Sequence, residues 1–218
     1  MNSRTDERTT GVILRTRLLT ETSLIVHWLT GDCGRIATVA KGARRPKSPF
    51  RGKLDLFYVA DLTFRRSRHS ELHALLEVGA RASFPEFRND WRRLTRAAYG
   101  VALIEQTTET DTPVPETFRL FLGYLEHLGG AQSGASSVLA LELRHLADMG
   151  MEPDWDRGNL SGEARALAER LVEGDWRALD VRSVDGEAEL ALARFLHGFL
   201  IFHLGRLPRG RSDALGTG

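Results

Sequence analysis

The residues best suited to chemistry lie in one short segment rich in arginine and lysine. Between Gly42 and Gly52 the chain carries Arg44, Arg45 and Lys47, together with two prolines and two glycines. Proline and glycine at this density predict an exposed loop. Long cationic side chains on such a loop can follow a phosphate backbone. The alternative is a solubilising loop without a ligand, because most charge runs are solvated faces.

The charge of the chain is unevenly distributed along its length. Residues 1–72 hold 14 Lys and Arg against 7 Asp and Glu, hence +7, whereas the remaining residues hold 16 against 22, hence −6. A basic first part predicts contact with a polyanion. The residues expected to bind it are Arg35, Lys41, Arg44, Arg45, Lys47, Phe50, Arg51, Lys53, Arg65, Arg66 and Arg68.

Four aromatic residues are interleaved with these cations, and an exposed ring on a barrel can stack on an unpaired base. A barrel core also needs rings. Phe57 and Phe64 are therefore expected in the core, and Tyr58 is left open. Phe50 lies between Pro49 and Arg51 in the loop and is the better stacking candidate.

Signatures of catalysis and of metal binding are weak. Residues 42–48 resemble a nucleotide-binding loop, but they lack the glycine before the lysine, and Pro46 removes a backbone N–H that such a cradle needs. His69 and His73 are four apart, yet their surroundings indicate a strand with no third ligand nearby. Cys33 is the single cysteine, which excludes an intramolecular disulfide and a cysteine-rich zinc site. We expect neither an enzyme nor a bound metal or cofactor.

The elements that position the basic segment are short strands. Apolar and β-branched residues with turn residues between them predict a hairpin over 11–30 with its bend at 19–22, and further strands at 35–40, 54–66 and 71–83. Along the third strand, Ile36 and Thr38 should face opposite Ala37 and Val39. Five short strands in about eighty residues favour a five-stranded oligonucleotide-binding barrel over a sandwich, which usually needs about seven.

After residue 89 the apolar period changes from two to 3.6. The first helix should begin at a cap at Asn89 or Asp90 and end before the prolines at 113 and 115. Its stripe is expected to hold Trp91, Leu94, Ala98, Val101 or Ala102, and Glu105. Further helices are expected at 116–128, 138–149, 161–173 and 187–204, the last with a stripe of Leu192, Phe195, Leu196, Phe199 and Phe202. The fold class is α+β, with a barrel domain at 1–85 and a helical partner-binding domain at 86–218.

The composition is that of a folded protein, 42% hydrophobic and 27% charged. No run of about 18 apolar residues occurs, and the first ten residues do not form a signal peptide. We therefore expect a cytoplasmic, nucleoid-associated protein that does not contact a membrane.

The order of these features resembles the bacterial DNA repair protein RecO family. The similarity lies in six segments across nearly the whole chain: 11–16, 21–26, 34–35, the specific Ala40–Ser48 (AKGARRPKS), 141–144 with Gly150, and 202–206. The resemblance implies binding of single- and double-stranded DNA and annealing of complementary strands. It also implies partners: a RecR-like protein and the C-terminal tail of the single-strand-binding protein, SSB, in the RecF pathway that loads recombinase. The family's basic signature falls on Lys41, Arg44, Arg45 and Lys47.

The chain departs from the family pattern in two places. Many members carry four cysteines of a zinc module after the equivalent of Asp154–Arg157, whereas this chain continues to Ser161 without a cysteine. The stretch after Arg206 is short, which puts any contact made by a longer basic tail in doubt. A partner dock is expected in the helical domain, with Leu143 and Arg144 as candidate residues.

Two rival functions stay open at this point. One is an RNA-binding barrel protein in translation or ribosome assembly, which would prefer RNA over DNA. The other is an enzyme with an acidic site around Glu105, Glu109 and Asp111. The spacing of these three acids is more typical of a solvated helix end.

Overall fold

The computed structural model describes residues 6–130, 133–155, 160–176, 179 and 184–217. These form two compact units. The first comprises Met1–Phe84 with Thr108–Phe118, and the second comprises Pro85–Thr107 with Arg119–Gly218. No helix among the described residues is long and apolar enough to span a membrane.

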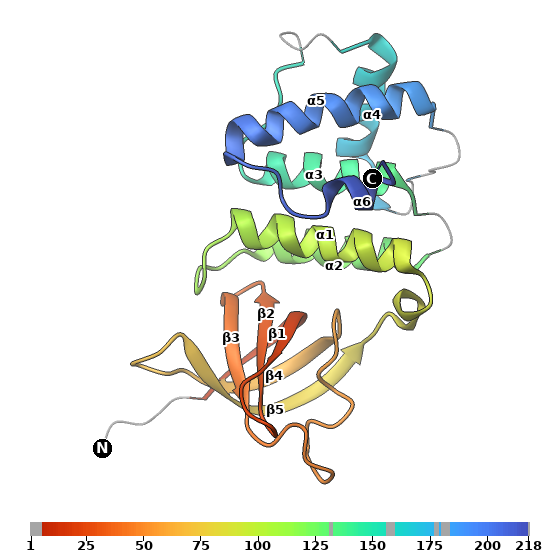
Figure 1. Ribbon diagram of the computed structural model, residues 1–218. Helices are drawn as coiled ribbons and strands as arrows, with labels where there is room; N and C mark the ends of the chain where they lie inside the picture. The colour runs from red at the N-terminus through yellow and green to blue at the C-terminus, as the bar shows by residue number, and fades with distance from the viewer. Residues whose placement is uncertain (1–5, 131–132, 156–159, 177–178, 180–183, 218) are drawn as a thin grey trace. The chain divides into compact units, whose positions relative to one another are not determined.

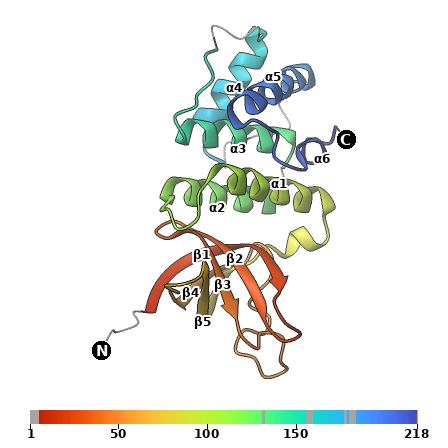
Figure 2. The same ribbon diagram turned by 60° about the vertical axis from the view of Figure 1, so that its left-hand side comes forward.

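The first unit is a closed five-stranded barrel (Figures 1 and 2). Its strands are β1 (Asp6–Leu18), β2 (Leu24–Thr30), β3 (Gly34–Ala40), β4 (Val59–Arg65) and β5 (Leu72–Ala82). They neighbour one another in the order β1-β2-β3-β5-β4, and β4 pairs with β1 to close the ring. Only the β3–β5 pair is parallel. The predicted oligonucleotide-binding barrel is confirmed.

The barrel core follows the period-two pattern of the strands. Along β3, Ile36, Thr38 and Ala40 are buried while the residues between them are half-buried, as predicted from alternation. On β2, Trp28 is fully buried and its Nε1–H donates to Thr38 Oγ1 at 2.8 Å. This bond satisfies the indole and the hydroxyl inside an otherwise apolar cluster.

Two strand boundaries differ from the prediction. The first strand begins at Asp6 rather than at residue 11, because polar residues 6–10 pair with β4. The fourth strand begins at Val59 rather than at residue 54. Phe57 takes a left-handed backbone (φ 62°), and Tyr58 N–H closes a turn onto Asp55 O at 3.2 Å. A strand cannot continue through such a turn.

The connection between the first two helices belongs to the barrel unit. Residues 108–118 fall within the expected helical domain at 86–218, but they pack with the strands instead. Thr110 bridges to Arg35 in parallel, the Asp111 N–H donates to the Arg35 carbonyl at 3.0 Å, and the Val114 N–H donates to the Gly31 carbonyl at 2.9 Å. The segment therefore covers the edge of the barrel beside β3.

Gly34 makes this close approach possible. Its φ is +69°, and a side-chain carbon there would overlap the backbone of Thr112. Gly52 has a similar φ of +71° with open space around it. Gly52→Ala should lower the free energy of unfolding by about 1–2 kcal/mol through backbone strain alone. Gly34→Ala should add an overlap cost of about 1–3 kcal/mol. Urea unfolding of both variants checks this difference, and equal losses would show that the 108–118 segment moves freely.

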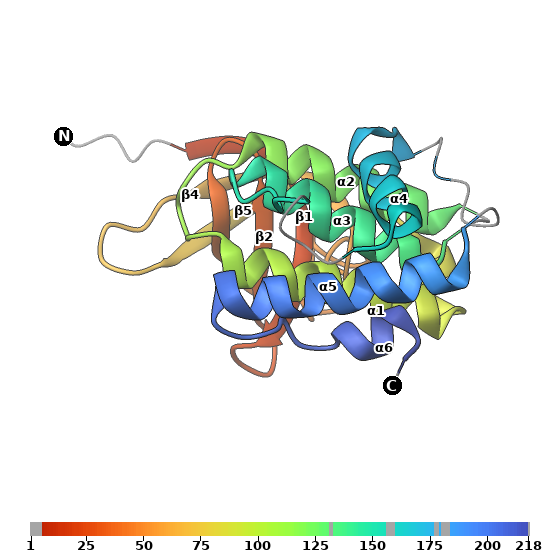
Figure 3. The ribbon, with the colours of Figure 1, turned by 90° about the horizontal axis from the view of Figure 1, so that it is seen from above.

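The second unit is helical. It contains the 3₁₀ turn η1 (Pro85–Arg88) and the helices α1 (Trp91–Thr107), α2 (Pro115–Gly129, whose first turn belongs to the barrel unit), α3 (Ala135–Asp148), α4 (Gly162–Glu173), α5 (Gly186–Leu204) and α6 (Arg211–Leu215). Five of these follow the predicted ranges closely, whereas α6 and η1 are new. The helix α4 packs against both α3 and α5 (Figure 3).

Two predicted helix stripes are wrong in part. On α1, Trp91 and Leu94 are 63% and 40% exposed, because the opposite face, around Gly100, is buried. A side-chain carbon at Gly100 would lie 3.0 Å from the rings of Phe121 and Tyr124, so this glycine sets the close contact with α2. On α5, Phe202 is 82% exposed although it was expected in the core.

A buried polar network ties α6 to α3 within the helical unit. Arg211 forms two parallel hydrogen bonds to Glu142, 2.7 Å from Nε to Oε1 and 2.9 Å from Nη2 to Oε2. The Tyr99 hydroxyl donates to the same carboxylate. All three residues are buried. Desolvation and the Glu142 charge raise the pKa of Tyr99 well above its usual value, so the phenol stays protonated as the donor.

Candidate nucleic-acid interface

The basic loop, defined here as residues 41–53, is held in place by its own turns and by two residues in the barrel core. Ala43 and Phe50 are buried among the core residues. Between them, the N–H groups of Arg45 and Ser48 close turns of 3.0 Å, onto the carbonyls of Gly42 and Arg45 respectively. With its apolar residues turned inward, the loop exposes cationic side chains: Lys41, Arg44, Arg45, Lys47 and Arg51.

The basic loop also bonds to the bend between β1 and β2. The Arg44 N–H donates to the Thr22 carbonyl at 3.0 Å, and the Arg44 guanidinium donates to the Glu21 carbonyl at 3.0 Å. The Gly42 N–H donates to Ser23 Oγ at 3.2 Å. These neutral acceptors fix Arg44 without cancelling its charge.

In the described part of the chain, the cations of the basic loop form no ion pair with a carboxylate. Arg51 donates to the Pro46 carbonyl at 3.2 Å, which is again neutral. Lys53 is half-buried at the end of the loop. The loop therefore keeps its positive charge for an external anion.

The hairpin tip, residues 66–71 between β4 and β5, behaves differently. Arg66 pairs with Glu7 at 2.8 Å and also with Asp111, and these carboxylates raise its pKa. At the end of β4, Arg65 pairs with Asp6 at 2.8 Å. Arg68 is exposed and forms no ion pair among the described residues. Of the three arginines expected to bind a polyanion here, two are already neutralised.

A second group of cations lies on the outer face of β1–β3. In register, Arg15 lies opposite His27, and Arg17 lies opposite Ile25. Burial and the neighbouring positive charges together lower the pKa of His27 from 6.5 to about 4. Burial is the largest cause, and the charges are those of Arg15, Arg17 and Arg35. This face therefore has a positive potential.

Arg35, which was expected to bind the polyanion, is bonded within the barrel unit. Its Nε donates to Thr108 Oγ1 at 2.9 Å, and its Nη2 donates to the Thr108 carbonyl at 2.6 Å. Arg15 and Arg17 were missed by the sequence analysis, although the alternation of the first strand places both on one face. The candidate interface thus combines the basic loop with this face of the barrel.

Two protein-family models match the chain. Residues 1–84 match the family model described as Recombination protein O N terminal, and residues 88–164 match Recombination protein O C terminal. The chain is 31% identical over 203 residues to the DNA repair protein RecO of Rhodopirellula baltica, covering 83% of this chain and 75% of that protein. The chain belongs to the RecO family.

Further RecO proteins show the same similarity at different coverage. The RecO protein of Idiomarina loihiensis is 30% identical over 219 residues, which cover 90% of this chain and 93% of that protein. The match to RecO of Myxococcus xanthus is 34% identical over 144 residues, 66% of this chain. The chain spans only 59% of that relative, and 60% of RecO from Syntrophus aciditrophicus.

In this RecO-family chain, Phe50 does not offer a stacking surface. The ring is 6% exposed and packs in the barrel core with Ala43. The apolar Phe50 side chain holds the loop onto the core, while the cations on either side of it face solvent. Phe57 and Phe64 are buried as predicted, and Tyr58 is half-buried beside them.

The two residues expected to dock a partner are engaged inside the helical unit. Leu143 is buried in the core, so it cannot line an open groove. Arg144 lies over the Trp176 ring, 4.2 Å from its centroid, and its Nε donates to the Leu171 carbonyl at 2.7 Å. Burial lowers the pKa of this guanidinium. In this structure, Arg144 of the family segment 141–144 therefore takes part in packing within the helical unit.

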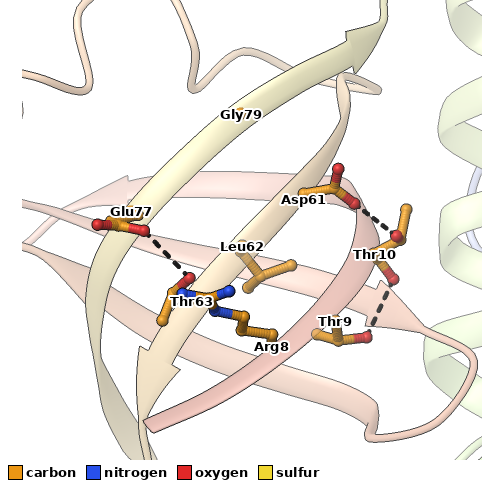
Figure 4. Close-up of a pocket in the computed structure, with 8 residues that line it drawn as sticks. All are labelled: Arg8, Thr9, Thr10, Asp61, Leu62, Thr63, Glu77 and Gly79. Carbon is orange, nitrogen blue, oxygen red and sulfur yellow. Dashed lines mark hydrogen bonds between the residues drawn. The ribbon is translucent and has the colours of Figure 1, made fainter.

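A depression of about 540 Å³ lies over β1, β4 and β5, and none of its lining residues belongs to the basic loop (Figure 4). Its lining mixes both signs of charge: Arg8, Thr9, Thr10, Asp61, Leu62, Thr63, Glu77 and Gly79. Asp61 accepts hydrogen bonds from Thr10 at 2.7 Å and from Arg81 at 2.7 Å. Such a surface has no excess of positive charge to attract a polyanion.

The histidines and acids considered for metal binding or catalysis are dispersed. His73 is buried beneath Phe64, 5.5 Å between ring centroids, whereas His69 is exposed on the hairpin tip. No metal-binding group of three such residues occurs among those the structure describes. The expected absence of a zinc module after 154–157 concerns a stretch that includes residues 156–159, which lie outside the described residues. Asp111, one of the three acids considered for catalysis, forms an ion pair with Arg66.

Proposed function

We propose that this RecO-family chain binds single- and double-stranded DNA through the basic loop and anneals complementary single strands. The observation that carries this proposal is the contrast between two arginine clusters on one barrel. Carboxylates neutralise Arg65 and Arg66, whereas Arg44, Arg45 and Lys47 keep their charge on a fixed loop. Phosphates are the anions that such a row of exposed cations binds best.

Annealing on this surface requires no bond chemistry. Two complementary strands repel each other through their phosphates, and cations that contact both strands lower that repulsion. The bases stay free to pair because the loop contacts only the backbone. Release of condensed counterions makes the process weaker as salt rises. Association with the nucleoid would follow from this affinity for DNA.

We further propose that the chain helps to load recombinase onto SSB-coated strands, with a RecR-like protein and the SSB tail as partners of the helical unit. The exposed face of α1 supports this proposal. Trp91 and Leu94 leave apolar surface open, and the Arg92 guanidinium lies 5.7 Å from the Trp91 ring centroid. An apolar face beside a cation suits an acidic, hydrophobic peptide end.

The test is annealing of two complementary labelled strands, each coated with SSB, over a range of salt concentrations. The chain should speed duplex formation relative to the protein-free reaction, and the acceleration should fade as salt rises. The same assay with RNA strands of equal length serves as the comparison. Faster annealing of RNA than of DNA would favour the translation or ribosome-assembly alternative, and no acceleration at low salt would contradict annealing altogether.

A further inference from the structure

A stripe of aromatic rings runs along the C-terminal half of α5. Figures 1 and 3 show this helix in the helical unit. The ring centroids of Phe195 and Phe199 are 6.0 Å apart, those of Phe199 and His203 are 4.2 Å apart, and those of His203 and Phe202 are 5.0 Å apart. Phe202 is the most exposed large apolar side chain that the structure describes. A continuous, open set of rings is more than a single stray surface residue.

The same stretch of chain is cationic. Residues 190–212 contain no Asp or Glu, and they hold four arginines and two histidines. Arg211 is taken up by Glu142, but Arg194, Arg206 and Arg209 are exposed. The nearest acids in the sequence are Glu189, which accepts from Ser136, and Asp213. Among the residues that the structure describes, these three arginines form no ion pair, so this end of α5 combines flat apolar rings with positive charge.

The opposite end of the stripe has different chemistry. There the Trp155 ring lies 5.7 Å from the Phe195 ring, between centroids, and Trp155 is flanked in sequence by Asp154 and close to Glu152. Anions would be repelled from that end. The binding surface that suits an anion is limited to the α5 stripe end, defined as Phe199, Phe202, His203, Arg206 and Arg209.

We propose that the α5 stripe end binds a single strand of nucleic acid, distinct from the strand on the basic loop. Bases of a single strand have free faces that stack on an exposed Phe202, and their phosphates suit Arg206 and Arg209. A duplex hides those faces, so the surface selects single strands. The inference rests on the proposed annealing function, because a second site on the chain would add a further contact for one of the two strands that annealing brings together.

The experiment uses the full chain and two strands that cannot pair, a donor-labelled oligo(dT) and an acceptor-labelled oligo(dC), each about 20 nucleotides long. Energy transfer reports both strands on one protein. Phe202→Ala should weaken binding of the second strand at least about fivefold, since stacking of one base on a ring is lost. Arg206→Glu should weaken it similarly, and the affinity for the first strand should stay unchanged in both variants. Leu190→Ala is the matched control, because Leu190 is exposed on α5 but lies off the stripe.

The outcomes separate this inference from the function on which it rests. Loss of the second strand in Phe202→Ala and Arg206→Glu, but not in Leu190→Ala, supports the stripe end as a strand site. Unchanged second-strand affinity in Phe202→Ala overturns it and leaves the stripe as a protein-docking face. A wild-type chain that binds one strand but never two also overturns it, with the annealing proposal still standing. A wild-type chain that binds no strand overturns the annealing proposal and this inference together.

Discussion

Arg44→Glu combined with Arg45→Glu is expected to abolish strand annealing and to lower the affinity for a single strand by on the order of a hundredfold at low salt. Both side chains are exposed on the basic loop and form no ion pair in the described part of the chain. Reversing them removes two phosphate contacts and adds two like charges beside the phosphates that remain. Because neither side chain packs in the core, the fold should be kept.

Salt dependence distinguishes lost phosphate contacts from a damaged fold. Each contact with a single strand contributes about 0.7 to the slope of log affinity against log salt, so two lost contacts should reduce that slope by about 1.4. The circular dichroism spectrum of the double variant should match that of the wild type, and its melting temperature should change little. Full annealing activity in this variant would remove the basic loop from the proposed interface.

The matched control carries the same change in net charge elsewhere. Arg119 and Arg170 are exposed on helices of the second unit and belong neither to the basic loop nor to the α5 stripe end. Arg119→Glu with Arg170→Glu should leave most of the annealing activity. An equal loss in both double variants would mean that overall charge, rather than this loop, determines binding.

The features that could be predicted from the sequence depend on residues that are close to one another in sequence. Alternation along 35–40 correctly predicted that Ile36 and Thr38 face opposite Ala37 and Val39. The density of glycine and proline correctly predicted a loop at 42–52. The helix start at Ser161 is also local, because its Oγ accepts from the Ala164 N–H at 3.3 Å. Each of these signals spans only a few residues, which is why the barrel and most helices were predicted well.

The site residues that were mispredicted depend on partners far away in the sequence. Arg66 pairs with Glu7, which lies 59 positions away, and with Asp111, 45 positions away. Counting charges along the chain cannot show which arginines are neutralised in this way. Phe50 and Leu143 show the same limit for packing, because composition does not tell whether an apolar side chain points to the core. By contrast, Arg15 and Arg17 were within reach of the strand periodicity.

Glu142→Gln is expected to lower the free energy of unfolding by about 3–5 kcal/mol, because it leaves the buried guanidinium of Arg211 without a counter-charge. The exposed pair Arg165–Glu169, with 3.1 Å between Arg165 Nε and Glu169 Oε1, is the control, and Glu169→Gln should cost no more than about 0.5 kcal/mol. Urea unfolding followed by tryptophan fluorescence measures both variants.

The double variant Glu142→Leu with Arg211→Met tests the cause of that loss. If the uncompensated charge is responsible, replacing both partners by apolar side chains of similar size should recover most of the stability lost in Glu142→Gln. If the double variant is as unstable as the single one, the hydrogen bonds themselves, including those from Tyr99 to Glu142 and from Arg211 to the Ala193 carbonyl at 3.1 Å, hold α6 in place. In that case release of α6 should also weaken the binding of the second nucleic-acid strand, because Arg206 and Arg209 directly precede this helix in the chain.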